Sequence, residues 1–276
     1  MSNVLIGIIN RNSPETGDTA YEHFSQTEKD IVLLENGSDP ENVSKYMTHH
    51  APASNGISWG VNYICKVALE KGYDYVWLCW NDARFEKPIE FLNWSIEKME
   101  SDKSIGIVTG YWSSVWDLNG RKNTGVEDVS FFDPLSFIVS SDCLKVTSNH
   151  DFRLDPFWDS SNHVGHYNIL GPSFALYQAG MRIVTNKNFI VTEDDPVRAI
   201  SDEKKRNEMS KKLRGYDENY WHHDLGVRVS EEWMDGFFPI PKDRIPEGVK
   251  LSPKQKRDFV IRTICDTYIK RPSRGT

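Results

Sequence analysis

Two polar residues, Asn81 and Asp82, end an apolar run in the sequence YVWLCWNDARF at 75–85. The run is short and rich in bulky apolar residues, which predicts a buried β-strand. A carboxylate at its end is costly unless it is paired, hydrogen-bonded or bound to a cation. Mg²⁺ and Mn²⁺ prefer oxygen ligands and need few protein carboxylates when substrate phosphates supply the rest. Asp82 therefore fits a metal–nucleotide site, and an aspartate that only caps a turn would give the same pattern.

A second chemically rich stretch lies at 150–170, where acids, histidines and aromatic residues are dense and apolar periodicity is weak. This composition is typical of a loop, and functional residues are common on loops. We expect this segment to contribute to a site.

The elements that must position these residues alternate between strands and helices. Apolar runs predict strands at 3–9, 30–35, 74–80, 104–112 and 181–186, and the segment 136–144 is predicted as a strand that runs into a turn or short helix. Apolar residues at three- and four-residue steps predict helices at 55–72, 87–101 and 171–180, and a polar, glycine-containing loop is expected at 117–128. Beyond about 195 the chain is polar and helical, with an extended linker at 237–246 and a last helix at 252–268.

The order strand, helix, strand favours an α/β sheet with parallel neighbours. In such sheets ligands bind beyond the carboxyl ends of the strands. Asn81 and Asp82 are expected at that edge. We predict a domain at 1–195 and a C-terminal helical extension at 196–276.

The chain of 276 residues is long enough to bury a substantial core. It has no stretch close to the roughly 18 apolar residues that cross a bilayer, and no secretory signal is recognised. The cysteines Cys65, Cys79, Cys143 and Cys265 lack metal-type spacing. We therefore expect reduced thiols in a cytoplasmic protein.

The net charge of -7 is unevenly distributed. Residues 250–276 hold eight basic and two acidic residues, and residues 203–214 hold six basic and two acidic ones. Such clusters are usually solvated helix faces, and a minority bind a phosphate-rich partner.

The ordered segments IGIINRN, IVLLENGSD, NGISWGVNYICKVALEKGYDYVWLCWNDARF and YQAGMRI resemble the GT-A fold glycosyltransferases of the family 2 type. The resemblance covers roughly residues 3–186. It implies a GT-A, Rossmann-like α/β fold with a mixed, mostly parallel sheet flanked by helices. It also implies a nucleotide-sugar donor, with UDP expected, and Mn²⁺ or Mg²⁺ as the cofactor.

The resemblance assigns nucleotide-binding roles to strand ends and to a helix start. The implied residues are Asn10, Arg11 and Asn12 beside the base, Glu35 toward uracil or ribose, Asn36 and Gly37 in the same turn, Asn55 and Gly56 at the start of the helix, and Asn81. Asp82 would be the surviving acid of the metal-binding motif.

This sequence departs from the family pattern at two points. Trp80 stands where the first acid of the DxD motif would be, so a further metal ligand could come from His222 or His223, or a Lys or Arg could replace the metal. The positions that match the family's catalytic base are Asn168 and Ile169, which cannot accept a proton in that role. We expect Asp159, and after it His166, to be the base; Asp155, His163, Glu193 and Asp194 are further candidates.

The sequence thus predicts transfer of a sugar from a nucleotide donor to an acceptor hydroxyl, with inversion implied by the resemblance. The acceptor could be a saccharide or small molecule held by aromatic residues, namely Trp112, Trp116, Phe157 and Trp158. A modified base in DNA is a second possibility, because the basic clusters could follow a phosphate backbone. The altered metal motif also leaves open a non-catalytic nucleotide-sugar or glycan-binding module.

Overall fold

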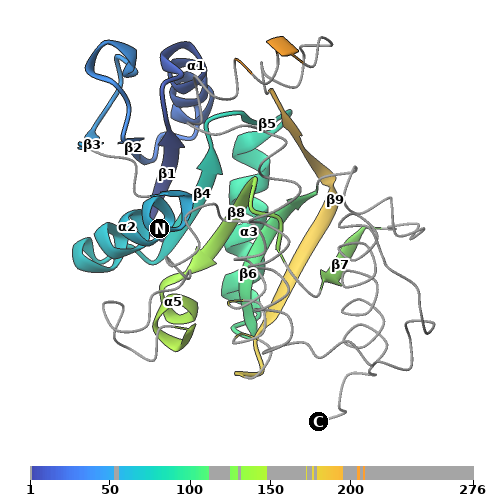
Figure 1. The fold of residues 1–276 in the computed structure, drawn as a ribbon. Coiled ribbons are helices and arrows are strands. Elements are labelled where there is room, and N and C mark those ends of the chain that lie inside the picture. Colours follow the sequence, from blue (N-terminus) through green and yellow to red (C-terminus); the bar gives the residue numbers. More distant parts are fainter. Residues whose placement is uncertain are drawn as a thin grey trace, which may run out of the picture.

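The computed structural model describes residues 2–52, 56–111, 125–129, 132–147 and 179–194, together with Pro172, Leu176, Lys204, Lys205 and Glu208. Within these residues, nine strands form a sheet in the order β3-β2-β1-β4-β8-β6-β9-β5, and β7 pairs with β9 (Figure 1). The strands are β1 (Val4–Asn10), β2 (Asp30–Asn36), β3 (His49–Ala51), β4 (Tyr75–Trp80), β5 (Ala83–Phe85), β6 (Ile105–Tyr111), β7 (Val126–Val129), β8 (Ser136–Ser140) and β9 (Arg182–Glu193).

Strands β3, β2, β1 and β4 run parallel to one another. Strand β8 is antiparallel to both of its neighbours, β4 and β6, whereas β6 and β9 are parallel. Strands β5 and β7 are antiparallel to β9. The mixed, mostly parallel sheet that the sequence predicts is confirmed.

Helices cover both faces of the sheet (Figure 1). Helices α2 (Gly56–Lys71) and α5 (Ser141–Thr147) contribute buried residues to the core on one face. Helices α1 (Pro14–Ser25) and α3 (Pro88–Ser101) contribute to the core on the other face. A short 3₁₀ helix, η1 (Pro40–Asn42), follows β2. The protein therefore has the three-layer architecture of an α/β fold.

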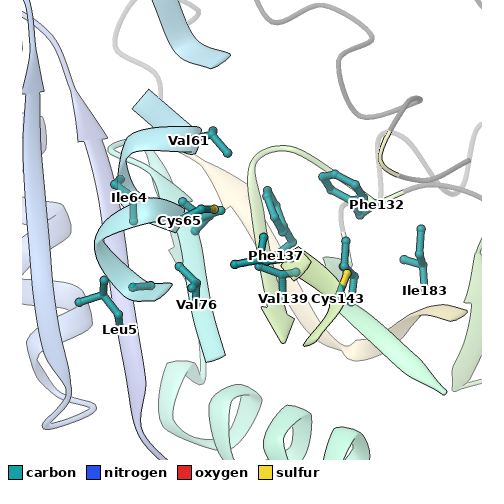
Figure 2. Packing of buried hydrophobic residues seen from close by; sticks show 14 of the residues in the cluster. Leu5, Val61, Ile64, Cys65, Val76, Phe132, Phe137, Val139, Cys143 and Ile183 are labelled. Carbon is teal, nitrogen blue, oxygen red and sulfur yellow. The ribbon is translucent and has the colours of Figure 1, made fainter. Parts of the chain in front are cut away.

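The core beneath α2 is packed tightly enough to fix this helix against the sheet. Figure 2 shows Ile64 and Cys65 of the helix above Leu5 and Val76 of the strands. A Cβ atom built on Gly7 would lie 2.4 Å from Ile64 Cγ2. Strand β1 therefore needs glycine here for α2 to approach so closely.

The structure confirms most of the predicted elements and corrects two predictions. Strand β7 occupies the end of the segment expected as a loop at 117–128, and β9 continues to Glu193, well beyond the predicted 181–186. Helix α1 was not predicted from the sequence, because it buries only Gly17, Ala20 and Phe24. Three residues in twelve form too narrow an apolar stripe to be recognised as periodic.

Burial explains the chemistry of three cysteines. Cys65, Cys79 and Cys143 are buried free thiols, and desolvation raises the pKa of each. A thiol in this state is unreactive, as expected for core cysteines. Cys265 lies outside the described residues, as do the domain boundary at 195–196 and nearly all of the predicted C-terminal extension.

Candidate functional site

Three neighbouring parallel strands bring predicted site residues to one edge of the sheet. Asn10 at the end of β1 is in register with Glu35 of β2, and Ile9 is in register with Trp80 of β4. Asn81 follows Trp80 and donates from Nδ2 to Oδ1 of Asn10 at 2.5 Å. The ends of β1, β2 and β4 thus lie side by side at the carboxyl edge of the sheet, where the sequence places Asn81 and Asp82.

Glu35 is the buried centre of this edge, with 0% of its surface exposed. Its Oε1 accepts hydrogen bonds from Asn10 Nδ2 at 2.8 Å and from the Ser44 backbone N–H at 2.7 Å. Its Oε2 accepts a hydrogen bond from Ser38 Oγ at 2.5 Å. The carboxylate thus joins the end of β1 to the segment that follows β2, and its contact with a nucleotide stays a prediction.

The turns after β1 and β2 are joined to each other. The Asn12 backbone N–H donates to Ser38 Oγ at 2.9 Å, and the Asp39 backbone N–H donates to Asn12 Oδ1 at 2.7 Å. Asn12 has a φ of 48° and Gly37 a φ of 76°. Both residue types tolerate this left-handed region better than most others. Asn10, Asn12 and Glu35 therefore belong to one hydrogen-bonded unit through Ser38. Arg11, the buried Asn36 and Gly37 lie at the same two strand ends.

The turn between β4 and β5 holds Asp82 by its backbone. Asp82 O accepts a hydrogen bond from the Asp194 N–H at 2.7 Å. Arg84 Nη1 donates to the carbonyl oxygens of Asn81 and Ala83, at 2.8 and 2.9 Å. Arg84 also lies 3.7 Å from the Asp194 carboxylate. A basic side chain thus lies within the acidic turn, although the pattern NDARF alone gave it no assigned role.

His23 of α1 forms a hydrogen bond with β5, the strand that follows this turn. Its Nε2 accepts a hydrogen bond from the Phe85 backbone N–H at 3.1 Å, so the ring must be neutral on that nitrogen. Burial, followed by the nearby Arg84 guanidinium, lowers the pKa of His23 below its ordinary value. The neutral ring is therefore the form that the folded protein favours.

Several predicted site residues lie outside the described residues. These are Asn55, Asp159, His166, His222 and His223, as well as the aromatic residues proposed for the acceptor. Gly56 is the first residue of α2, as the sequence predicted.

Solved structures share this architecture, among them two that align with 98% of this chain, whereas no protein-family model and no curated protein matches the sequence. One is GalNAc-T7 with UDP, GalNAc and Mn²⁺, at 11% identity and a TM-score of 0.54 over 98% of this chain and 57% of that one. The other is the mannosyltransferase PcManGT from Pyrobaculum calidifontis with GDP-Man and Mn²⁺, at 9% identity and a TM-score of 0.53, covering 98% and 76%. The chain has a GT-A fold.

The GT-A fold predicted from the sequence resemblance is thus confirmed. At this identity the likeness establishes the fold alone, and the chain spans only 57% of the length of GalNAc-T7. No helix in the described part of the chain is long and apolar enough to cross a membrane.

The residues at the GT-A strand edge fit a divalent cation only with help from a ligand. Among the described residues, no group of three or more His, Cys, Asp or Glu could hold a metal ion. Asp82 provides a carboxylate and the adjacent Asn81 an amide oxygen. A magnesium or manganese ion can be held by one or two protein oxygens when phosphates complete its coordination. This donor set is consistent with a cation that arrives with a nucleotide diphosphate.

Proposed function

We propose that this protein is a glycosyltransferase that moves a sugar from a nucleotide-sugar donor, with UDP the expected nucleotide, to an acceptor hydroxyl. The observation that carries the proposal is the joined strand edge: Asn10, Glu35 and Asn81 connect through hydrogen bonds beside Asp82, within a GT-A fold. Both structures cited above for this fold were determined with a nucleotide or nucleotide sugar and Mn²⁺.

In this proposal the nucleotide lies across the ends of β1, β2 and β4. The turns at 10–12 and 35–37 border the base and ribose, and Gly56 begins the helix that faces the nucleotide. Asp82 would hold the Mn²⁺ or Mg²⁺ ion. A bound cation supplies positive charge that stabilises the departing diphosphate.

Asp159, or His166 after it, removes the proton from the acceptor hydroxyl in a single displacement with inversion. Both residues are placed in this role by sequence reasoning. His222 or His223 completes the metal ligands if a further one is needed.

The experiment is hydrolysis of UDP- and GDP-sugars by the full chain, with Mn²⁺ or with EDTA. We expect metal-dependent turnover in the wild type and a loss of about 10²–10³-fold in Asp82→Ala, the size of effect seen when one preorganised electrostatic contact to a transition state is removed. Asp142→Ala is the matched control, because Asp142 is an exposed aspartate of α5 that pairs with the exposed Lys145. Turnover that is equal in all three proteins would contradict the role of Asp82.

A non-catalytic nucleotide-sugar-binding module is the second candidate, favoured by Trp80 at the position of the first metal-binding acid. It predicts that UDP binds while no sugar donor turns over under any metal condition. Transfer to a modified DNA base is distinguished by the acceptor: DNA binding should weaken steeply between low and moderate salt.

A further inference from the structure

Resting on the proposed function, we infer that Glu35 is a positioning residue that acts on Asn81 through Asn10. Asn81 donates a hydrogen bond to Asn10, and Asn10 donates one to Glu35. These two hydrogen bonds orient the Asn81 amide so that its oxygen, and not its NH₂ group, is left to face a divalent cation beside Asp82. Asn81 would then supply an oxygen ligand where Trp80 has replaced the usual acid.

The Glu35 carboxylate sets the donor and acceptor roles in these hydrogen bonds. Oε1 of Glu35 accepts from the Ser44 backbone N–H, a group that can only donate. Oε1 is therefore an acceptor, and the Asn10 atom 2.8 Å from it has to be the NH₂ nitrogen. If the amide of Asn10 were reversed, two oxygen atoms would face each other in a site that excludes water.

The orientation of Asn10 then determines that of Asn81. With its NH₂ group on Glu35, Asn10 presents Oδ1 to Asn81, and only the NH₂ group of Asn81 can donate to it. Of the two polar side-chain atoms of Asn81, Oδ1 is the one that takes no part in these hydrogen bonds. The assignment follows from donor and acceptor chemistry and does not depend on how either amide is drawn.

Helix α1 prevents Asn10 from leaving this arrangement. Asn10 is 1% exposed, and a Cβ atom built on Gly17 would lie 2.8 Å from its Nδ2 and 3.0 Å from its Cγ. The side chain is thus confined between the helix and Glu35. A confined amide transmits the orientation set by the carboxylate.

An amide oxygen is chemically suited to the proposed cation. Mg²⁺ and Mn²⁺ are bound by carboxylate, carbonyl and water oxygens, whereas an NH₂ group would repel them. Hydrogen bonds from Arg84 and Asp194 hold the backbone of the turn that carries Asn81 and Asp82. The two side chains therefore offer adjacent oxygens from a fixed turn.

The test measures Mn²⁺ binding directly, by electron paramagnetic resonance of the bound ion in the presence of UDP, and UDP binding in EDTA by calorimetry. We expect Asn81→Ala and Asn10→Leu each to weaken Mn²⁺ binding by about 10–100-fold, the usual effect of losing a group that orients a metal ligand. Because residue 10 also borders the proposed base site, Asn10→Leu should weaken UDP binding in EDTA as well, and in each variant the loss of Mn²⁺ affinity should exceed the loss of UDP affinity in EDTA. Asn93→Ala, at an exposed asparagine of α3, is the control and should bind like the wild type.

A rescue variant separates orientation from a general structural effect. In Asn10→Leu/Asn81→Asp, residue 81 offers an oxygen in every orientation and no longer faces Asn10 Oδ1, so Mn²⁺ affinity should return toward the wild-type value. A merely structural loss in Asn10→Leu would not be recovered by this second change.

The outcomes also separate this inference from the proposed function. If wild-type protein binds UDP and Mn²⁺ while Asn81→Ala and Asn10→Leu bind Mn²⁺ equally well, the inference is wrong and the proposed function stands. If wild-type protein binds neither a UDP nor a GDP nucleotide with or without Mn²⁺, the proposed function fails, and the inference fails with it.

Discussion

Ser38 connects the two turns that border the proposed nucleotide site. Its hydroxyl accepts from the Asn12 N–H and donates to Glu35 Oε2. Ser38→Ala removes the hydroxyl that pairs with both of these groups. Leaving a buried polar group without its hydrogen bond costs about 1–3 kcal/mol. We expect a loss of that size in the free energy of unfolding, measured by urea denaturation, together with weaker UDP binding.

The matched control is Ser25→Ala. Ser25 is an exposed serine whose hydroxyl donates to the Glu22 carbonyl within α1. A surface change of this kind should alter stability by no more than about 0.5 kcal/mol. Equal effects of the two substitutions would show that Ser38 does not hold the turns together.

His23 makes the turn after β4 sensitive to pH. Its folded-state pKa lies below the ordinary value of 6.5, because burial and Arg84 disfavour the charged ring. The stability that it contributes is therefore present above pH 6.5 and is lost as the pH falls through the folded-state pKa. Protonation on Nε2 would break the hydrogen bond from the Phe85 N–H.

His23→Gln keeps an acceptor and cannot be protonated in this range. We expect the melting temperature of the variant to rise relative to the wild type as the pH is lowered below about 6.5. Thermal unfolding followed by circular dichroism between pH 8 and pH 5 measures the difference. A difference that does not change with pH would mean that His23 does not titrate in the folded protein as inferred.

At the scale of single elements, α1 packs closely against the Asn10 side chain at Gly17. Glycine to alanine in a helix normally stabilises by about 1 kcal/mol. Here the added methyl group would meet Asn10 at 2.8 Å, and overpacking costs about 1–3 kcal/mol. Gly17→Ala should therefore destabilise the fold and weaken Mn²⁺-dependent UDP binding.

Thr19→Ala tests whether this effect belongs to the buried face of α1. Thr19 is exposed on the same helix, and its hydroxyl donates to the Glu15 carbonyl. Because alanine is the stronger helix former, this variant should unfold at the wild-type temperature or above it. If Gly17→Ala is as stable as Thr19→Ala, Asn10 has room to move.

The elements that the sequence predicted well are those with strong apolar patterns. Strands β1, β2 and β4 are buried along most of their length, and α2 repeats its apolar residues at helical spacing. The short strands β3 and β5 were not predicted, because three residues carry too little pattern and their pairing depends on distant partners. The length of β9 was underestimated for a related reason. The end of β9 contains polar residues, and backbone pairing with β5 keeps them in a strand that their sequence pattern does not indicate.

For the whole molecule, the proposed ligands should stabilise the folded state by mass action. A nucleotide at 100 times its Kd adds about 2.7 kcal/mol to the free energy of unfolding. We expect UDP with Mn²⁺ to raise the melting temperature of the full chain more than UDP with EDTA does. The difference should disappear in Asp82→Ala and persist in Asp142→Ala.

A panel of nucleotides and nucleotide sugars in the same thermal assay identifies the donor class. Stabilisation by no nucleotide, with Mn²⁺ or with EDTA, would contradict a nucleotide-sugar site. Stabilisation by UDP without any sugar turnover would favour the non-catalytic module.

The sequence by itself determined the α/β order, the GT-A resemblance and the strand ends that meet at one edge, because hydrophobic periodicity and turn residues are local signals. It also drew attention to Asp82, since a carboxylate after a buried strand is costly. Only the tertiary structure showed that Glu35 is buried and bonded to Asn10, Ser38 and Ser44. Those contacts join residues up to 25 positions apart, and the contact between Asn81 and Asn10 spans 71. The direction of a hydrogen bond across such a separation depends on packing and burial, which no local pattern of residues specifies.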